Sequence, residues 1–191
     1  MSGPFAEVSA ELMPRIRQWA SELGFQALEV SDTDLSEDEA RFFAWLDDGR
    51  AGDMDYLSRH GHRRTRPHDL VPGTIRVITV RMNYLPRTAT SMRAILEDPE
   101  QAYISRYALG RDYHKLIRTR LQRLASRIET IIGPFGYRAF ADSAPVLERA
   151  LAAKSGLGWT GKHTNIIARG VGSWFFLGEL YTNLPLPISP P

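Results

Sequence analysis

Residues 142–165 read DSAPVLERALAAKSGLGWTGKHTN, and they indicate how this part of the chain folds. The segment before them, residues 137–141, is typical of a β-strand, so Asp142 falls at a strand end. Pro145 suits the first turn of a helix, and Gly156 ends that helix. A glycine-dense turn follows, and its polar residues are Lys162, His163 and Asn165. The pattern predicts a carboxylate and a polar loop within reach of one ligand.

The rest of the chain alternates helical and strand-like segments. Apolar residues recur at helical spacing over residues 8–23 and again over residues 111–132. A capping-box pattern at residues 36–39 predicts a further helix that ends at Gly49. Strands are predicted at residues 25–30, 74–84, 103–107, 137–141, 164–168 and 173–177. We expect the second of these at the sheet centre and a hairpin turn at residues 169–172. The mixture predicts an α+β fold, with a central mixed sheet flanked by helices.

The composition indicates a globular protein without thiol chemistry. The 191 residues are enough for one sizeable domain with its own core. Hydrophobic residues make up 43% and charged residues 24%, and the net charge of +2 is too small to indicate a nucleic-acid partner by itself. No run of about 18 apolar residues and no signal-peptide pattern occurs, so we expect a cytoplasmic protein. The absence of cysteine excludes disulfides, and this chain alone cannot hold an iron–sulfur cluster.

Three glycines near residue 160 match a known phosphate-binding spacing. Gly156, Gly158 and Gly161 fit G-x-G-x-x-G, and residues 156–163 come within one residue of the phosphate-loop pattern. Both motifs need a helix after the glycines, because the amides at the start of that helix bind the phosphates. Here a predicted helix comes first and a strand-like segment follows. A helix end followed by a loop would explain the glycines alone, but the polar residues clustered after them favour a ligand loop of another kind.

Two interpretations of Asp142 stay open at this stage. A carboxylate at a helix start is stabilised by the helix dipole, which lowers its pKa. A general acid would instead need a raised pKa, which burial beside an apolar cofactor face provides. The sequence does not choose between these opposite shifts.

Several polar segments could bind a ligand or simply face the solvent. Residues 59–66 hold the densest run of cations, and three arginines share one face of the long helix, namely Arg120, Arg123 and Arg127. RNA phosphates bound by these cations would show as a steep salt dependence. Residues 105–114 read either as an exposed helix cap or as a polar anchor loop. The histidines near residue 62 lack the partners and spacing of a metal site.

Four stretches together resemble the N-terminal catalytic domain of the epoxyqueuosine reductase family, which acts in the last step of queuosine biosynthesis in tRNA. They are residues 64–73, 104–114 (ISRYALGRDYH), 142–165 and 172–187 (GSWFFLGELYTNLPLP). The resemblance covers nearly the whole chain, and the stretches follow one another in the family's order. Their combination is far more specific than any one of them.

The resemblance implies a cobalamin-dependent oxidoreductase that reduces the epoxide of epoxyqueuosine in a tRNA anticodon loop. It implies that Asp142 is the proton donor. It also implies that cobalamin is contacted by Arg64, Arg106, Tyr107, Gly158, Gly161, Lys162, His163 and Asn165. The family's domain is similar in architecture to reductive dehalogenases and flavin nitroreductases. A ferredoxin-like domain with two four-iron four-sulfur clusters follows it.

This sequence departs from the family pattern because it reaches Pro191 without a cysteine. We therefore expect a cobalamin-binding catalytic domain at residues 1–183. The proline-rich residues 184–191 are expected to be a frayed end or the start of a linker to an iron–sulfur domain absent from this chain. Electrons would then come from a separate iron–sulfur domain or protein. Two other functions stay open, a non-catalytic tRNA-binding module and a flavin-dependent reductase.

Overall fold

The computed structural model describes residues 4–85 and 91–190. The strands are β1 (Ala27–Ser31), β2 (Arg76–Asn83), β3 (Tyr137–Phe140), β4 (Trp159–Thr160), β5 (Ile166–Ile167) and β6 (Phe175–Thr182). The α-helices are α1 (Pro4–Glu22), α2 (Ser36–Asp47), α3 (Pro67–Leu70), α4 (Met92–Glu97), α5 (Tyr113–Ile132) and α6 (Glu148–Lys154). Short 3-10 helices are η1 (Asp55–Leu57), η2 (Gly61–Arg64) and η3 (Arg106–Ala108).

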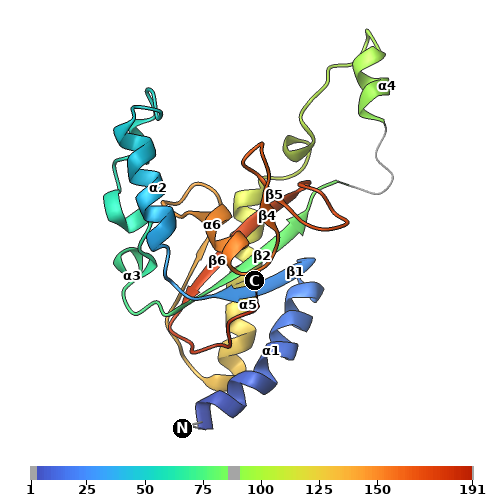
Figure 1. Ribbon diagram of the computed structural model, residues 1–191. Helices are drawn as coiled ribbons and strands as arrows, with labels where there is room; N and C mark the ends of the chain where they lie inside the picture. The colour runs from blue at the N-terminus through green and yellow to red at the C-terminus, as the bar shows by residue number, and fades with distance from the viewer. Residues whose placement is uncertain (1–3, 86–90, 191) are drawn as a thin grey trace.

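The main sheet has the strand order β1-β2-β6-β3 (Figure 1). Its three described pairs are all antiparallel, and a separate two-stranded sheet pairs β4 with β5. The expected α+β architecture is confirmed, and so is the inner position of β2. The sheet is antiparallel in these pairs rather than mixed.

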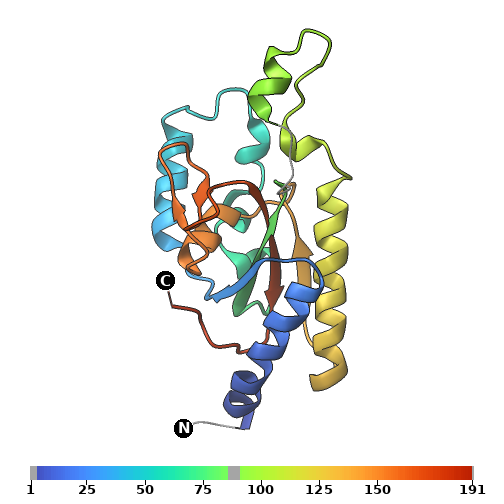
Figure 2. The ribbon, with the colours of Figure 1, turned by 90° about the vertical axis from the view of Figure 1, so that its right-hand side faces the viewer.

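Helices α1 and α5 cover one face of the main sheet (Figure 2). The apolar stripe of α5 is fully buried there, and its residues are Ile117, Leu121, Leu124, Ala125 and Ile128. Gly178 of β6 lies under this stripe, where a Cβ atom would overlap Cγ2 of Ile117. The glycine therefore lets α5 approach the sheet. Among the described residues, neither these two helices nor any other is long and apolar enough to cross a membrane.

The opposite face of the sheet packs against α6 and the β4–β5 pair. Side chains alternate along a strand, so the neighbours of Gly178 point to this second face. Leu177 packs there with Ala152 of α6, and Tyr181 packs with Leu151. Glu179 lies between them on β6 and is fully buried.

Two expected features of the strand pattern are wrong. Residues 103–105 have no regular structure, and η3 follows them. The hairpin expected at residues 169–172 does not form, since β5 pairs with β4 while β6 pairs with β2 and β3. Only an isolated bridge joins Ala168 to Gly172. The strand β6 takes an inner place because residues 177–182 are all buried, as a strand covered on both faces requires.

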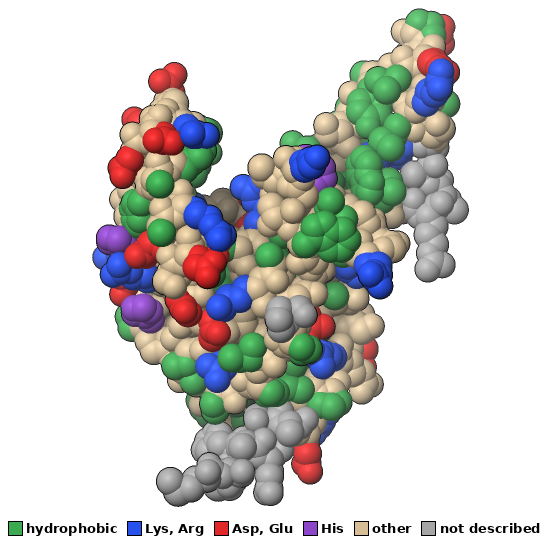
Figure 3. Space-filling model, in the orientation of Figure 1, with side chains coloured by type: hydrophobic (Ala, Val, Ile, Leu, Met, Phe, Trp, Pro, Cys, Tyr) green, Lys and Arg blue, Asp and Glu red, His purple; other side chains and the backbone are tan. Residues whose placement is uncertain are grey.

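The expected capping box at the start of α2 is also wrong. Leu35 is the N-cap residue, and no side chain caps it. Glu39 instead accepts a hydrogen bond from Nη2 of Arg66 at 2.8 Å and another from the Thr65 hydroxyl. These contacts, the one from Arg66 above all, lower the pKa of Glu39 to about 2. They tie α2 to the segment before α3, and α2 and α4 project from the body with a hollow between them (Figure 3).

The proline-rich tail packs on the domain instead of fraying from it. Leu186 is 2% exposed and belongs to the core cluster formed with α1 and α5. The amide of Ser189 donates to the carbonyl of Val30 at 2.9 Å, and the Val30 amide donates to Oγ of Ser189 at 3.0 Å. The tail therefore runs beside β1, and the packed core extends past residue 183.

Candidate active site

A cleft of about 210 Å³ opens where β6 meets the first residues of α5 and α6. Its aromatic and aliphatic lining residues are Tyr84, Tyr107, Tyr113, Ile166, Phe175, Phe176 and Leu177. Its polar residues are Asp142, Glu148, Arg149, Asn165 and Ser173. An adjoining cleft of about 430 Å³ shares Tyr84, Tyr107, Tyr113 and Phe176 with it. We call the two together the aromatic cleft.

Stacked rings form the shared wall of the aromatic cleft. The Tyr113 ring lies 3.9 Å from the Phe176 ring, centroid to centroid, with 6° between the planes. The Tyr84 ring lies 4.6 Å from Phe176 on another side. Burial of the two tyrosines raises the pKa of both phenols, so they stay neutral near neutral pH. Flat apolar walls beside polar groups suit a planar ligand.

Asp142 stands at the wall of this cleft, two residues beyond β3. Its backbone φ is 54°, a region that residues other than glycine rarely adopt. Its Oδ2 atom accepts a hydrogen bond from the Tyr113 hydroxyl and lies 3.0 Å from Nε2 of His114. The helix-start interpretation is wrong, because α6 begins only at Glu148. The Asp142 side chain is 51% exposed, so the burial that a general acid needs would have to come from a ligand that covers the cleft.

His114 links Asp142 to a second carboxylate. Its Nδ1 atom lies 3.0 Å from Oδ1 of Asp112, which also accepts from the backbone amide of His114 and so caps α5. The hydrogen bond from His114 holds the pKa of Asp112 below its usual range. An imidazole held between two carboxylates can carry a proton from one to the other. His114 is not among the predicted site residues, although an Asp-x-His spacing before a long helix is visible in the sequence.

Two further carboxyl groups lie near Asp142, the half-buried Glu148 and the fully buried Glu179. Glu148 accepts a hydrogen bond from the backbone amide of Asp142 at 3.3 Å. Burial, and then the charge of Asp142, raise the pKa of Glu148 to about 7. Burial raises the pKa of Glu179 well above its usual range, and the carboxylates of Glu148 and Asp142 add to the effect. The sequence predictions miss both residues, although a glutamate inside the apolar run of residues 174–181 was a signal for Glu179.

Four of the predicted site residues come together at the aromatic cleft. Asp142 and Asn165 line its smaller part, and Tyr107 lines both parts. Arg106 lines the larger part and, like Tyr107, belongs to η3. These residues come from three segments far apart in the sequence.

Four other predicted residues form the neighbouring turn without lining the cleft, namely Gly158, Gly161, Lys162 and His163. A Cβ atom on either glycine would overlap atoms of the turn or of β5, so the glycines make room for the protein's own packing. His163 accepts from the amide of Asn165 at 3.2 Å, and Lys162 is exposed. Arg149 fixes this turn to α6 by donating to the carbonyl and the hydroxyl of Thr164, each at 2.9 Å.

Arg64 lies apart from the aromatic cleft. It is 8% exposed within η2, and its Nη2 atom donates to the carbonyl of Tyr56 at 3.2 Å. Its guanidinium also lies 6.0 Å from the centre of the Phe42 ring, so it packs beneath α2. Burial lowers the pKa of Arg64 from its ordinary value. The structure does not bring Arg64 together with the other predicted cobalamin contacts.

A groove of about 680 Å³ runs along the other side of the Asp142 loop. Its basic residues are His60, Arg63, Arg118 and Arg138, and Ala141 and Ser143 also line it. Within residues 4–85 and 91–190, no carboxylate lies within salt-bridge distance of these arginines. We call it the basic groove.

The predicted stripe on α5 is different from the basic groove. Arg127 pairs with Glu22 at 2.5 Å, and Arg120 contacts the sulfur of Met82 at 3.2 Å. Only Arg123 of the predicted three is left as an exposed cation with no salt bridge among the described residues. The stripe is therefore mostly engaged in contacts within the protein.

Comparison with known proteins gives consistent matches along the sequence. The family model described as "Epoxyqueuosine reductase QueG, DUF1730" matches residues 64–143. An epoxyqueuosine reductase of Pseudomonas aeruginosa is 58% identical over 181 residues, which cover 95% of this chain and 50% of that relative. The chain spans about half the length of the curated relatives that it matches.

Solved structures share the fold at lower identity. An epoxyqueuosine reductase with an epoxyqueuosine-modified tRNA-Tyr stem loop has a TM-score of 0.80 at 20% identity, with 96% of this chain and 48% of that one covered. The Bacillus subtilis enzyme, solved with an aspartate catalytic loop swung out of its active site, has a TM-score of 0.78 at 20% identity with the same coverage. A reductive dehalogenase whose structure suggests a mechanism for B12-dependent dehalogenation has a TM-score of 0.52 at 16% identity, over 92% of this chain and 20% of that one. By its sequence, the chain is similar to about half of the length of these epoxyqueuosine reductases.

Proposed function

We propose that this chain binds cobalamin in the aromatic cleft and reduces the epoxide of epoxyqueuosine in a tRNA anticodon loop, with Asp142 as the proton donor. The position of Asp142 carries the proposal. Its carboxylate stands at the aromatic wall, between the Tyr113 hydroxyl and the His114 imidazole. The same loop lines the basic groove on its other side. An acid between a flat apolar site and a cationic groove suits a reaction between a ring cofactor and an RNA base.

The residues of the aromatic cleft fit the faces and the edge of a corrin ring. Tyr84, Tyr107 and Phe176 offer flat surfaces, while Arg106 and Asn165 offer polar groups for the amides at the ring edge. Bound cobalamin would supply the electrons that remove the epoxide oxygen. The family resemblance also implies iron–sulfur clusters that feed these electrons, and a chain without cysteine would receive them from another domain or protein.

Asp142 has to carry a proton when the substrate arrives. Ligands that cover the cleft would exclude water from the half-exposed side chain, and an apolar environment favours the neutral, protonated form of a carboxyl group. Tyr113 and His114 would hold the carboxyl group in place while it donates.

Cobalamin uptake tests the cofactor part of this proposal. Adding hydroxocobalamin to the purified chain should change the visible spectrum and raise the melting temperature, because a ligand that binds the folded state stabilises it. Tyr107→Ala should weaken binding about three- to tenfold by removing one aromatic wall. Tyr56→Ala is the matched control, because Tyr56 is similarly exposed (55% against 52%) but lies on η1, outside the cleft. A spectrum that stays unchanged with excess cobalamin would contradict the proposal, and a yellow preparation would favour the flavin-dependent alternative.

Salt-dependent RNA binding tests the basic groove. Lysines and arginines that contact phosphates release counterions, so each lost contact to a single strand should reduce the slope of log K against log salt by about 0.7. We expect this reduction for Arg118→Ala and for Arg138→Ala, measured with a fluorescent tRNA stem loop at several salt concentrations. Arg123→Ala is the control, since Arg123 is exposed on the same helix as Arg118 but lies outside the groove.

The same salt titrations, together with the cobalamin measurements, distinguish the proposed reductase from a non-catalytic tRNA-binding module. Equal slopes for all three arginine variants would remove the groove from the RNA site. RNA binding without cobalamin uptake would favour a non-catalytic tRNA-binding module.

A further inference from the structure

The proposed reaction needs one more proton than Asp142 can hold. Removing an epoxide oxygen as water breaks two carbon–oxygen bonds, forms a carbon–carbon double bond and forms two oxygen–hydrogen bonds. The balance requires two protons and two electrons, the latter from a low-potential carrier of the iron–sulfur class. A single carboxyl group supplies one proton per turnover. A second proton must reach the same oxygen while the substrate covers the cleft.

Glu148 is placed to supply protons to Asp142. Its carboxyl group accepts from the Asp142 backbone amide at 3.3 Å, and both residues line the same cleft. Glu148 is the first residue of α6, which packs across β2 and β6. The charge of Asp142 also acts on Glu148, which makes Asp142 a natural acceptor of a proton from Glu148.

Glu179 lies deeper on the same side of the sheet. Gly178 faces α5, so the next residue on β6 points to the α6 face. Glu179 is 0% exposed, and neither of its oxygens has a hydrogen-bond partner among the described residues. Thr79 stands directly opposite on β2, and its buried hydroxyl is likewise without a partner there. A buried carboxyl group without partners is costly when charged, so it is kept neutral by a bound proton.

We propose that Glu148 and Glu179 form a proton store that delivers the second proton of the reaction through Asp142. After Asp142 has given its proton to the substrate oxygen, its carboxylate takes the proton of Glu148, and the proton left on the pair is then shared between Glu179 and Glu148. Asp142 can then donate again. The store is left with one carboxylate, which solvent reprotonates when the cleft opens. This inference rests on the proposed function.

The neighbouring acids favour a bound proton on one another, because two carboxylates at close range repel. Within the described residues, no group of three or more histidines and acids could hold a metal ion. The groups that face Glu148 are Asp142, Glu179, Arg149, His114 and Tyr113, and among these Asp142 has the largest effect on the pKa of Glu148. Glu179 faces Glu148 and Asp142, and from its own strand it acts on Tyr181, whose pKa is raised chiefly by burial. Arg81 of β2 shares this face of the sheet and lies over the Phe175 ring, 5.5 Å from its centre.

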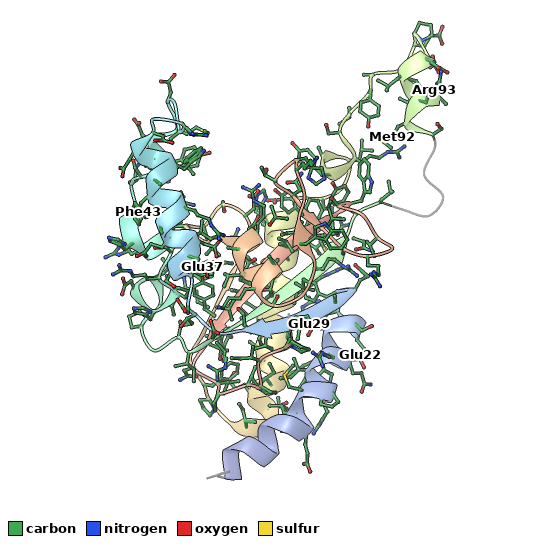
Figure 4. The ribbon with its side chains drawn as sticks, in the orientation of Figure 1. Glu22, Glu29, Glu37, Phe43, Met92 and Arg93 are labelled. Carbon is green, nitrogen blue, oxygen red and sulfur yellow. The ribbon has the colours of Figure 1, made fainter. Side chains whose placement is uncertain are left out.

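The proton store is testable without cofactor or substrate. The infrared spectrum of the chain near pH 6 should contain protonated-carboxyl bands, and Glu148→Gln and Glu179→Gln should each remove one. The free energy of unfolding should also fall as the pH rises from 4.5, the ordinary value for Glu148, to about 7, because the folded state binds the proton more tightly. In each variant, the free energy of unfolding should decrease less over this pH range. Glu37→Gln, on the exposed outer helix α2, should change neither measurement (Figure 4).

Turnover measurements then test whether the reaction takes its second proton from this store. The assay uses the chain supplied with cobalamin, an electron donor and a modified stem loop. In it, Glu148→Gln should slow epoxide removal by about 10²-fold, and the rate should fall more steeply as the pH rises. Glu148→Asp should restore part of the rate, whereas a purely structural role would give no rescue by a shorter acid. Missing carboxyl bands, or rates within about twofold of normal in both Gln variants across the pH range, would overturn the inference. If no variant and no unmodified chain turns over while the bands are present, the proposed function fails and the protonated pair stands.

Discussion

Asp142→Asn is expected to lower the rate of epoxide reduction by about 10²–10⁴-fold while cobalamin and RNA binding stay unchanged. The amide has the shape of the carboxyl group and can still accept from the Tyr113 hydroxyl. It has no acidic proton, so it cannot protonate the departing oxygen. Single-turnover conversion of a modified stem loop, followed by mass spectrometry of its nucleosides, measures the effect.

A control separates the loss of the acid from a general loss of negative charge. Asp53→Asn changes an exposed turn residue that lines neither the aromatic cleft nor the basic groove, and its rate should match that of the unmodified chain. Binding of cobalamin by Asp142→Asn should be measured in the same preparation. Turnover close to normal in this variant would remove Asp142 from the donor role.

Gly178→Ala is expected to lower the free energy of unfolding by about 1–3 kcal/mol, because it overpacks the contact between α5 and the sheet. The new methyl group would overlap Cγ2 of Ile117 and lie 3.3 Å from Cδ1 of Leu121. Both neighbours are fully buried, so neither can move into solvent. Urea unfolding followed by circular dichroism measures the change.

A double-mutant cycle shows whether the clash with Ile117 is the cause. Ile117→Ala alone leaves a cavity, which costs about 2–5 kcal/mol. In the double variant the new methyl group fills part of that cavity, so the two costs should not add, with a coupling of about 0.5–3 kcal/mol. Gly110→Ala is the control, since nothing lies within 4 Å of a Cβ atom at that position. A loss of stability in Gly178→Ala no larger than that of the control would contradict the close-packing argument.

Patterns that repeat over a few residues predicted their elements well. The apolar periodicity of residues 111–132 predicted α5 within two residues of its start, and the β-branched run at residues 74–84 predicted β2 and its inner position. The predictions were wrong where a local sequence pattern competes with a contact to residues distant in the sequence. Glu39 has the spacing of a capping box, yet Arg66 and Thr65 offer it stronger hydrogen bonds. Residues 169–172 resemble a hairpin turn, yet β6 pairs with strands that are distant in the sequence.

The sequence also predicted some residues of the candidate site and missed others. The order of acid, helix and polar turn in residues 142–165 was enough to bring Asp142 and Asn165 to one cleft, with Tyr107 from a separate segment. The roles of His114 and Glu148 depend on the distance from each side chain to Asp142, which only the folded chain sets.

The sequence by itself determined the α+β class, the long helix and the central strand, because these depend on residue types and on spacings of a few positions. Only the tertiary structure decided that Glu179 is buried without partners and that the proline-rich tail joins the core beside β1. Burial and pairing depend on which distant segments pack against one another. The free energy that stabilises these contacts comes from the whole packed domain rather than from any short stretch of it.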